Sequence, residues 1–190
     1  MADSNTAVEM DSHIVDFQTS EDLAGLVAFW KESGGNDTDF DCQCIRGILD
    51  MCFGNKARGV IRESGCIKFV LECLEKEQCR ANFVSVCFQL LTRVLDGSAA
   101  VSTASDAGIL RVLSKYLALH ASDAEVQGNG AGLVWLLASD ATVRGQINSS
   151  EIPNLVRAGS KIFKPIQAGR RNPFCYQLRV SRAALQRLSA

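Results

Sequence analysis

The stretch Asp106–Ser150, DAGILRVLSKYLALHASDAEVQGNGAGLVWLLASDATVRGQINSS, contains the pattern that decides the fold. In its first part, apolar side chains recur at the spacing of one helix face: Ile109, Val112, Leu113, Tyr116, Leu117 and His120. Ser122 or Asp123 can cap a second helix, whose inner face runs through Val126, Gly130, Leu133, Val134 and Leu137. We therefore predict two amphipathic helices and a short third one at Asp140–Asn148.

The same unit recurs along the chain at a nearly constant interval. Ser64-Gly65-Cys66-Ile67 precedes one copy just as Ala107-Gly108-Ile109 precedes another, and the two glycines are 43 residues apart. Helices of this length cannot bury both of their apolar faces alone, so such units must stack on one another. A period near 42 residues, with two long helices and a short one, is typical of α-solenoid proteins.

Residues 125–138, EVQGNGAGLVWLLA, resemble the third helix of an armadillo repeat, and Gly108-Ile109-Leu110 resembles the start of its second helix. Leu91–Leu95 repeats the pattern of Leu133–Leu137 at a distance of 42 residues. The resemblance covers roughly residues 57–160. It implies an all-α fold, a right-handed α-solenoid of about four armadillo-like repeats in one domain over 18–190, with repeats at about 18–63, 64–106, 107–149 and 150–190.

Other periodic segments place the remaining helices of these repeats. One helix is expected to start after Thr19–Asp22, and the others lie at Phe40–Phe53, Ala57–Glu63, Cys66–Glu75, Arg80–Leu95, Ile152–Phe163 and Pro173–Leu188. Gly54-Asn55 is interpreted as the end of one helix, and Ser98–Ser105 as a connection. Residues 1–17 are polar, acidic and without a period, so we predict a disordered or loosely docked leader.

Charge is distributed unevenly although the net charge is only −1. Residues 1–50 carry eleven acidic and two basic side chains, and residues 151–190 carry one acidic and eight basic side chains. Clusters of like charge in a sequence usually lie on solvent-exposed surfaces and have no binding role. The alternatives are that the basic end meets an acidic partner, or that opposite ends of two copies associate.

The N-terminal residues lack the basic start and apolar core of a secretory signal, so we expect the eight cysteines to be reduced. Most of them lie among Ile, Phe, Val and Leu, where a free cysteine acts as a small hydrophobic side chain. No run of 18 apolar residues occurs, so no membrane span is expected. We predict a cytoplasmic protein.

Chemistry-bearing residues are few. Only His13 and His120 could serve as imidazole bases, and neither has a partner nucleophile in a recognisable pattern. Asp37, Asp39 and Asp41 match the start of a calcium loop, but the glycine and the glutamate that such a loop needs at its sixth and twelfth positions are missing. A helix N-terminus is the better interpretation. The spacing of Cys42 and Cys44 fits neither a zinc half-site nor a redox pair. We predict no catalytic residues, no metal, no cofactor and no small-molecule substrate.

The resemblance implies binding of an extended peptide or a protein domain on a concave surface lined by third helices. Trp135 stands at a position that is often Trp or Arg in the family, and Arg93 occupies it one repeat earlier. The asparagine ladder that nuclear-import receptors use is missing, since Leu136 and Val94 stand in its place. We therefore predict a non-catalytic protein-interaction scaffold or adaptor, with Arg93, Gln127 and Trp135 in its contact patch.

A second candidate binding site lies at the basic end, at Arg170, Arg171, Arg179 and Arg182. Two alternatives to a passive scaffold remain at this stage. One is a chaperone cofactor of the nucleotide-exchange type, which would grip a partner domain. The other is weak nucleic-acid binding through the C-terminal arginines, which the absence of aromatic residues among them disfavours.

Overall fold

The computed structural model describes residues 14–18, 22–76, 78–162 and 175–189, and in these ranges every regular element is a helix. By internal contacts the chain divides into two compact units, residues 1–96 and 97–190. The boundary between the units falls inside the second of the four expected repeats.

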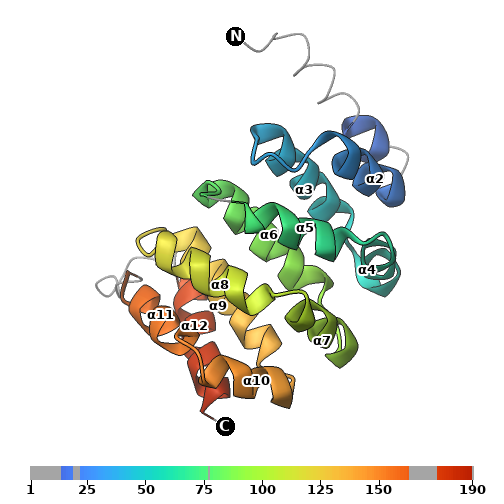
Figure 1. Ribbon diagram of the computed structural model, residues 1–190. Coiled ribbons are helices and arrows are strands. Elements are labelled where there is room, and N and C mark those ends of the chain that lie inside the picture. Colours follow the sequence, from blue (N-terminus) through green and yellow to red (C-terminus); the bar gives the residue numbers. More distant parts are fainter. Residues whose placement is uncertain (1–13, 19–21, 77, 163–174, 190) are drawn as a thin grey trace. The chain divides into compact units, whose positions relative to one another are not determined.

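The first unit contains five of the helices labelled in Figure 1: α2 (Leu23–Ser33), α3 (Asp39–Met51), α4 (Gly54–Glu63), α5 (Cys66–Glu75) and α6 (Ala81–Val94). Helix α3 lies beside α6, and α2 packs against both α3 and α4. The apolar side chains of α6 are buried on nearly every side of the helix, as its sequence predicts: Phe83, Val84, Val86, Cys87, Phe88, Leu90, Leu91 and Val94. This helix therefore forms the centre of the first unit's core.

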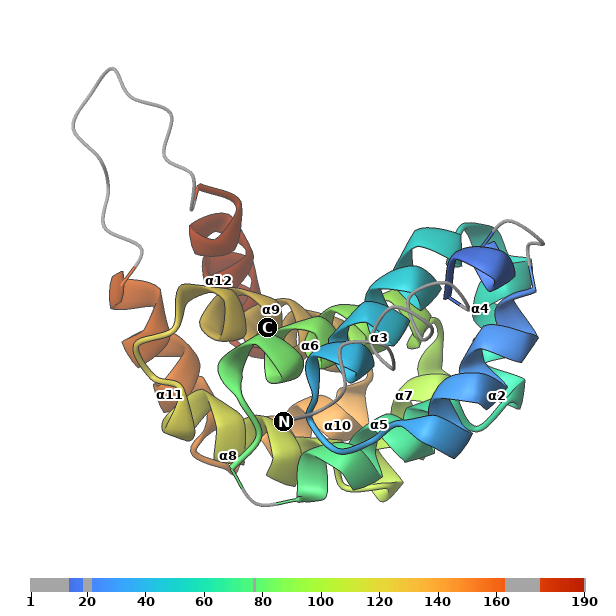
Figure 2. The ribbon, with the colours of Figure 1, turned by 90° about the horizontal axis from the view of Figure 1, so that it is seen from above.

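The second unit contains α7 (Ser98–Asp106), α8 (Ile109–Leu119), α9 (Ala124–Leu137), α10 (Ala141–Asn148), α11 (Ile152–Gly159), the 3₁₀ turn η1 (Ser160–Ile162) and α12 (Cys175–Leu188). Asp123 caps α9 by accepting hydrogen bonds from Glu125 N and Val126 N. Helix α12 runs along α9, as Figure 2 shows, and α11 packs against α8, α9 and α12. Burial on almost every side of α9 explains how its three glycines are tolerated, because neighbouring helices approach it closely.

Two glycines at equivalent places show that both units use the same local construction. Gly65 precedes α5 with φ +74°, and Gly108 precedes α8 with φ +90°, so both lie in the left-handed region. A residue with a Cβ is strained there, which explains glycine at both positions. Side-chain hydrogen bonds also join residues about one period apart: Arg80 to Asp39 in the first unit, and Ser105 to Gln146 in the second, each across 41 residues. The chain is thus all-helical and repeat-like.

Two interpretations of the sequence are corrected by the structure. Ser98–Asp106 is helix α7 and not a connection, because Val101 and Ala104 give a weakly polar segment one buried face. Gly54 begins α4 and does not end α3, whose C-cap is Cys52. Most of the expected leader, residues 1–13, lies outside the described part; its last residues, 14–17, form a helical turn together with Gln18, and Ile14 is buried.

None of the helices in the described part of the chain is both long enough and apolar enough to cross a membrane.

Candidate functional site

Trp135, on the last turn of α9, is one of the few large hydrophobic side chains that the described residues expose, with 39% of its surface accessible. The guanidinium of Arg187 on α12 lies over its indole ring, 4.3 Å from the ring centroid. Arg187 Nη1 also donates a hydrogen bond to the carbonyl oxygen of Trp135, at 3.0 Å. The cation–π contact covers part of the indole, while the hydrogen bond ties Arg187 to the backbone of the same residue.

Packing of α12 on α9 decides which α12 side chains reach the surface. Ser181, Ala184 and Leu188 are buried. A Cβ on Gly132 would lie 3.6 Å from Val180, so the two helices are in ordinary van der Waals contact there. This register turns Arg179 and Arg182 outward, and both side chains are exposed.

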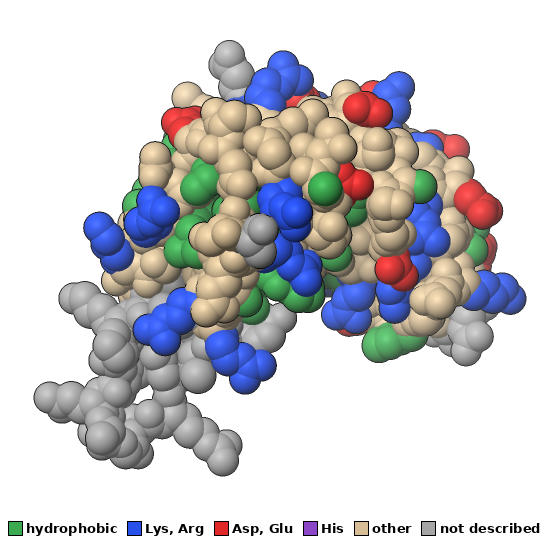
Figure 3. Space-filling view, turned by 90° about the horizontal axis from the view of Figure 1, so that it is seen from below, with side chains coloured by type: hydrophobic (Ala, Val, Ile, Leu, Met, Phe, Trp, Pro, Cys, Tyr) green, Lys and Arg blue, Asp and Glu red, His purple; other side chains and the backbone are tan. Residues whose placement is uncertain are grey.

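Arg179 and Arg182 make no hydrogen bond or ion pair with any part of the chain that the structure describes. The other two residues of the predicted basic site, Arg170 and Arg171, lie outside the described residues. Figure 3 shows one face of the molecule, on which Lys and Arg side chains lie among hydrophobic and polar ones.

Gln127 does not belong to an exposed patch, which corrects its placement from the sequence. Its side chain is 2% exposed, and its Nε2 donates hydrogen bonds to the carbonyl oxygens of Leu117 (2.8 Å) and His120 (3.1 Å) at the end of α8. A Cβ on Gly159 would collide with the Gln127 amide, so α11 approaches from the other side. The residue joins three helices and is structural.

Arg93, the remaining member of the predicted patch, lies in the first unit on the last turn of α6. Its side chain is exposed, and no hydrogen bond or ion pair is formed with it by the described residues. Val94 beside it is buried, so the position that would carry a ladder asparagine faces the core here.

The aspartates in the loop before α3 and in its first turn bond to other groups of the first unit. Asp41 is fully buried and accepts hydrogen bonds from Trp30 Nε1 (2.7 Å), Gly35 N, Asn36 N (3.0 Å) and both the N–H (2.9 Å) and the hydroxyl of Thr38 (2.8 Å). Thr38 and Asp41 form a capping box at the start of α3, as the interpretation of this segment as a helix N-terminus predicts.

Burial of the Asp41 carboxyl by itself raises its pKa, but the hydrogen bonds from Gly35, Thr38 and Trp30 outweigh burial and hold the pKa below its ordinary value. The carboxylate is therefore ionised and its lone pairs are occupied. Asp37 and Asp39 face Arg80, whose Nη1 lies 3.1 Å from Asp39 Oδ1. The described residues contain no group of three or more His, Cys, Asp or Glu side chains arranged to hold a metal ion.

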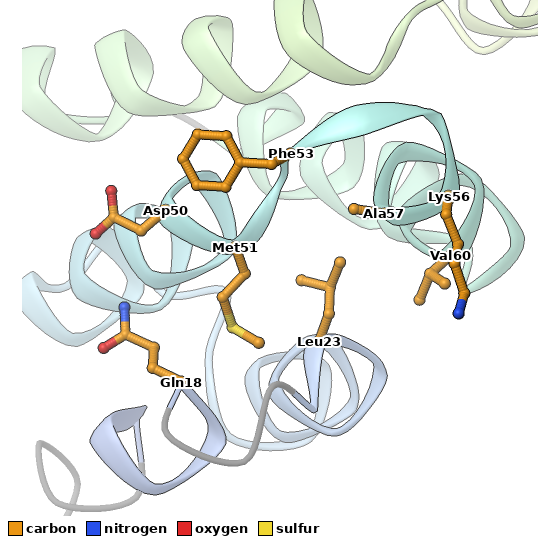
Figure 4. A pocket seen from close by; sticks show the side chains of 8 residues that line it. All are labelled: Gln18, Leu23, Asp50, Met51, Phe53, Lys56, Ala57 and Val60. Carbon is orange, nitrogen blue, oxygen red and sulfur yellow. The ribbon is translucent and has the colours of Figure 1, made fainter.

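A hollow of about 460 Å³ in the first unit was not anticipated from the sequence. Its lining side chains come from the turn before α2, from α2 itself, from the end of α3 and from α4: Gln18, Leu23, Asp50, Met51, Phe53, Lys56, Ala57 and Val60. Phe53, 72% exposed, stands at its rim, and Figure 4 shows Asp50 and Lys56 on opposite sides of it. The sequence analysis placed Phe53 at the end of the helix Phe40–Phe53, whereas the structure makes it the N-cap residue of α4.

The thiols and imidazole of the described chain do not form a nucleophilic centre. Seven cysteines are free and buried, and burial raises the pKa of Cys44, Cys66 and Cys73 to about 12, so these thiols stay protonated. His120, the one histidine among the described residues, stacks on Tyr116 with ring centroids 5.9 Å apart. These groups have packing roles.

Comparison with known proteins adds information about the fold alone. No model of a protein family matches the chain, and no curated protein gives a match. One solved crystal structure, described as an engineered protein, is similar with a TM-score of 0.65 and 18% sequence identity. The similarity covers 88% of this chain, which spans 38% of the length of that protein. At this identity the likeness supports an all-helical arrangement and carries no function.

Proposed function

We propose that this chain is a non-catalytic protein-interaction module of the armadillo-like α-solenoid class, and that it binds a partner protein or peptide through Trp135 and its surroundings. The observation that carries the proposal is an exposed indole fixed by Arg187, with the guanidinium 4.3 Å from the ring centroid. Tryptophan and arginine are the side chains most enriched among residues that dominate binding energy at protein interfaces.

A fixed orientation matters because immobilising a side chain on binding costs about 0.5–1.5 kcal/mol. In the free protein the Trp135 ring already stacks with the guanidinium of Arg187, which restricts its rotamers. A partner that packs on the exposed part of the indole therefore gains apolar contact with a smaller entropic cost. This supports a recognition role over one in which the ring only completes the core.

The armadillo-like part of the proposal rests on repeated construction. The left-handed glycines before α5 and α8, and the side-chain hydrogen bonds that cross about one period in each unit, are the features expected of stacked helical repeats. Third helices in such repeats line the binding surface, and α9 with α12 occupies that place in the proposed arrangement. The basis for a scaffold is thus the combination of repeat construction and a preorganised surface tryptophan.

The experiment is affinity capture from an extract of the cells that produce the protein, with three immobilised forms: wild type, Trp135→Ala and Leu119→Ala. Leu119 is the matched control, because it is an exposed apolar residue of the same unit, at 51% exposure. We expect a partner retained by wild type and Leu119→Ala, and bound roughly thirtyfold more weakly by Trp135→Ala, the ratio for a hot-spot loss of about 2 kcal/mol.

Melting curves for all three forms decide whether a loss of binding is specific. Trp135→Ala loses the cation–π contact, about 0.5–1 kcal/mol, and also the packing of the part of the indole that is not exposed, so its melting point shows whether it is folded at the assay temperature. If Trp135→Ala and Leu119→Ala retain every partner as well as wild type does, the Trp135 surface is not the binding site.

A further inference from the structure

Helix α12 presents an arginine face, which we define as Arg179, Arg182 and Arg187. The helix contains three arginines and no Asp or Glu, so none of these charges is balanced within the helix. Arg187 is engaged with Trp135, whereas Arg179 and Arg182 are exposed and lack a hydrogen bond or ion pair with the described residues. Residues three apart on a helix have Cβ atoms about 5–6 Å from each other. The two outward guanidinium groups thus form one local cationic site.

Acidic side chains of the second unit are largely committed to other roles. Asp123 accepts hydrogen bonds at the N-terminus of α9, and Asp140 does so at the N-terminus of α10. Glu151 accepts a hydrogen bond from the hydroxyl of Ser114 on α8. None of these carboxylates pairs with Arg179 or Arg182, so both guanidinium groups are available to a complementary negative charge on a ligand.

Carboxylates fit this face better than a nucleic-acid strand does. Single-stranded nucleic acid is held by several aromatic platforms beside a basic groove. Here Trp135 is the one exposed large aromatic side chain of the described second unit, and Arg187 already covers one side of its ring. Arginine forks pair with carboxylates through two parallel hydrogen bonds, which gives both strength and orientation.

We propose that the arginine face binds an acidic segment of a partner protein, in which two carboxylates pair with Arg179 and Arg182 while an apolar side chain packs on Trp135. Arg179 and Arg187 are separated by about 12 Å along the helix. Roughly four residues of an extended chain span this distance. The segment is therefore short, with acidic and apolar residues within a few positions of each other. This inference rests on the proposed function, since it names the chemistry of the partner for the same surface.

Fluorescence anisotropy with defined probes tests the inference on the full chain at about 50 mM salt, where surface charge interactions are weakly screened. The first probe is a labelled twelve-residue peptide made of three copies of Leu-Glu-Glu-Ser. The second replaces each Glu by Gln, and the third is a labelled twelve-nucleotide single strand. We expect binding of the acidic peptide, at least tenfold weaker binding of the Gln peptide, and weaker binding of the single strand.

Three double variants locate the site. Arg179→Glu/Arg182→Glu is expected to weaken acidic-peptide binding at least tenfold. Arg179→Lys/Arg182→Lys keeps the positive charges but removes the planar guanidinium groups that pair with carboxylates through two hydrogen bonds, and it is expected to weaken acidic-peptide binding a few-fold. The matched control is Arg111→Glu/Arg157→Glu, which makes the same change in charge at two exposed arginines of α8 and α11 and should stay within twofold of wild type. Circular dichroism confirms that each variant is folded.

Several results overturn the inference. Equal losses of acidic-peptide binding in the α12 variant and in the control variant would show that the effect comes from net charge alone. Tighter binding of the single strand than of the acidic peptide would assign the arginine face to nucleic acid. Absence of acidic-peptide binding by wild type would also refute it. Capture of a Trp135-dependent partner in that last case would leave the proposed function standing, whereas its absence would remove both.

Discussion

Replacing Asp41 should destabilise the first unit strongly, because its carboxylate holds the loop between α2 and α3 to the start of α3. The buried carboxylate accepts one hydrogen bond from Trp30 Nε1, three from backbone N–H groups of residues 35, 36 and 38, and one from the Thr38 hydroxyl. Asp41→Asn keeps the size and shape of the side chain and changes its charge and half of its acceptor capacity. It is therefore a narrow perturbation of this network.

The magnitude follows from the donors that lose their acceptor. In Asp41→Asn the amide oxygen can still accept from Trp30 and Gly35, but the amide nitrogen then faces the N–H groups of Asn36 and Thr38. Each buried donor without an acceptor costs about 1–3 kcal/mol, and the loop donors lie at the low end because they are partly exposed. We expect a loss of about 2–4 kcal/mol, a large share of the 5–15 kcal/mol that stabilises a typical domain.

The pH dependence has a definite sign. The pKa of Asp41 in the folded protein lies below its ordinary value of 3.8, so the carboxylate contribution is fully present above the unfolded pKa and is lost as pH falls through the folded pKa. The stability difference between wild type and Asp41→Asn should thus be constant from about pH 5 to pH 7, and it should shrink below about pH 4.

Urea denaturation followed by tryptophan fluorescence gives the measurement, because the chain has two tryptophans and each unit holds one. In a Trp135→Phe background, Trp30 alone reports on the first unit. Thr38→Val is the comparison that leaves the charge but removes the hydroxyl that donates to Asp41 and caps α3 by accepting from Asp41 N, with an expected loss of about 1–2 kcal/mol. A loss below 1 kcal/mol in Asp41→Asn, or a difference from wild type that does not shrink in acid, would refute this account of the network.

Three further predictions concern other parts of the chain. Gln127→Leu should destabilise the second unit by about 1–3 kcal/mol, because two carbonyl oxygens at the end of α8 lose their hydrogen-bond donor. Urea denaturation followed by Trp135 fluorescence measures the loss, and an unchanged denaturation midpoint would contradict the prediction. Gly108→Ala should cost about 1–2 kcal/mol through its left-handed φ of +90°, with Ala107→Gly as a nearby control in the same thermal melts. The buried thiols should not react with Ellman's reagent in the native protein at neutral pH, and all of them should react in denaturant. Rapid labelling of Cys66 in the native protein, identified by mass spectrometry, would contradict its burial.

Helix positions were predictable where apolar periodicity and a capping residue agree. Cys66–Glu75 has the boundaries predicted from the sequence, and α8, α9 and α10 are correct within a residue or two. Helix α7 was missed because Ser98–Asp106 has only two buried side chains and many small polar ones, so its helical state depends on the neighbours that cover Val101 and Ala104. The start of α4 at Gly54 was missed for a different reason. Glycine usually follows the end of a helix in a left-handed conformation, and Gly54 does have φ +77°, but here it is the first residue of the next helix.

For the candidate site, helical register placed Arg179 and Arg182 on the outer side of the last helix, and both are exposed; Trp135 was proposed from the armadillo resemblance and is 39% exposed, and whether these residues bind a partner stays a prediction. The sequence could not show that Gln127 is buried, because a polar side chain on a helix can either face solvent or bond to the free carbonyl groups at the end of another helix. It also gave no signal for the hollow beside Phe53, which exists only because α2, α3 and α4 meet there. Pairing of Arg187 with Trp135, 52 residues away in the chain, is likewise a product of packing.

The sequence by itself determined the all-helical class, the period near 42 residues and most helix boundaries, because helix formation depends on local apolar periodicity and capping. Tertiary structure decided which polar groups are buried and which charges stay free. Asp41 and Gln127 are satisfied by donors and acceptors that lie on other helices or loops, while Arg179 and Arg182 find none among the described residues. Burial and pairing depend on which segments meet in space, and local sequence does not specify that.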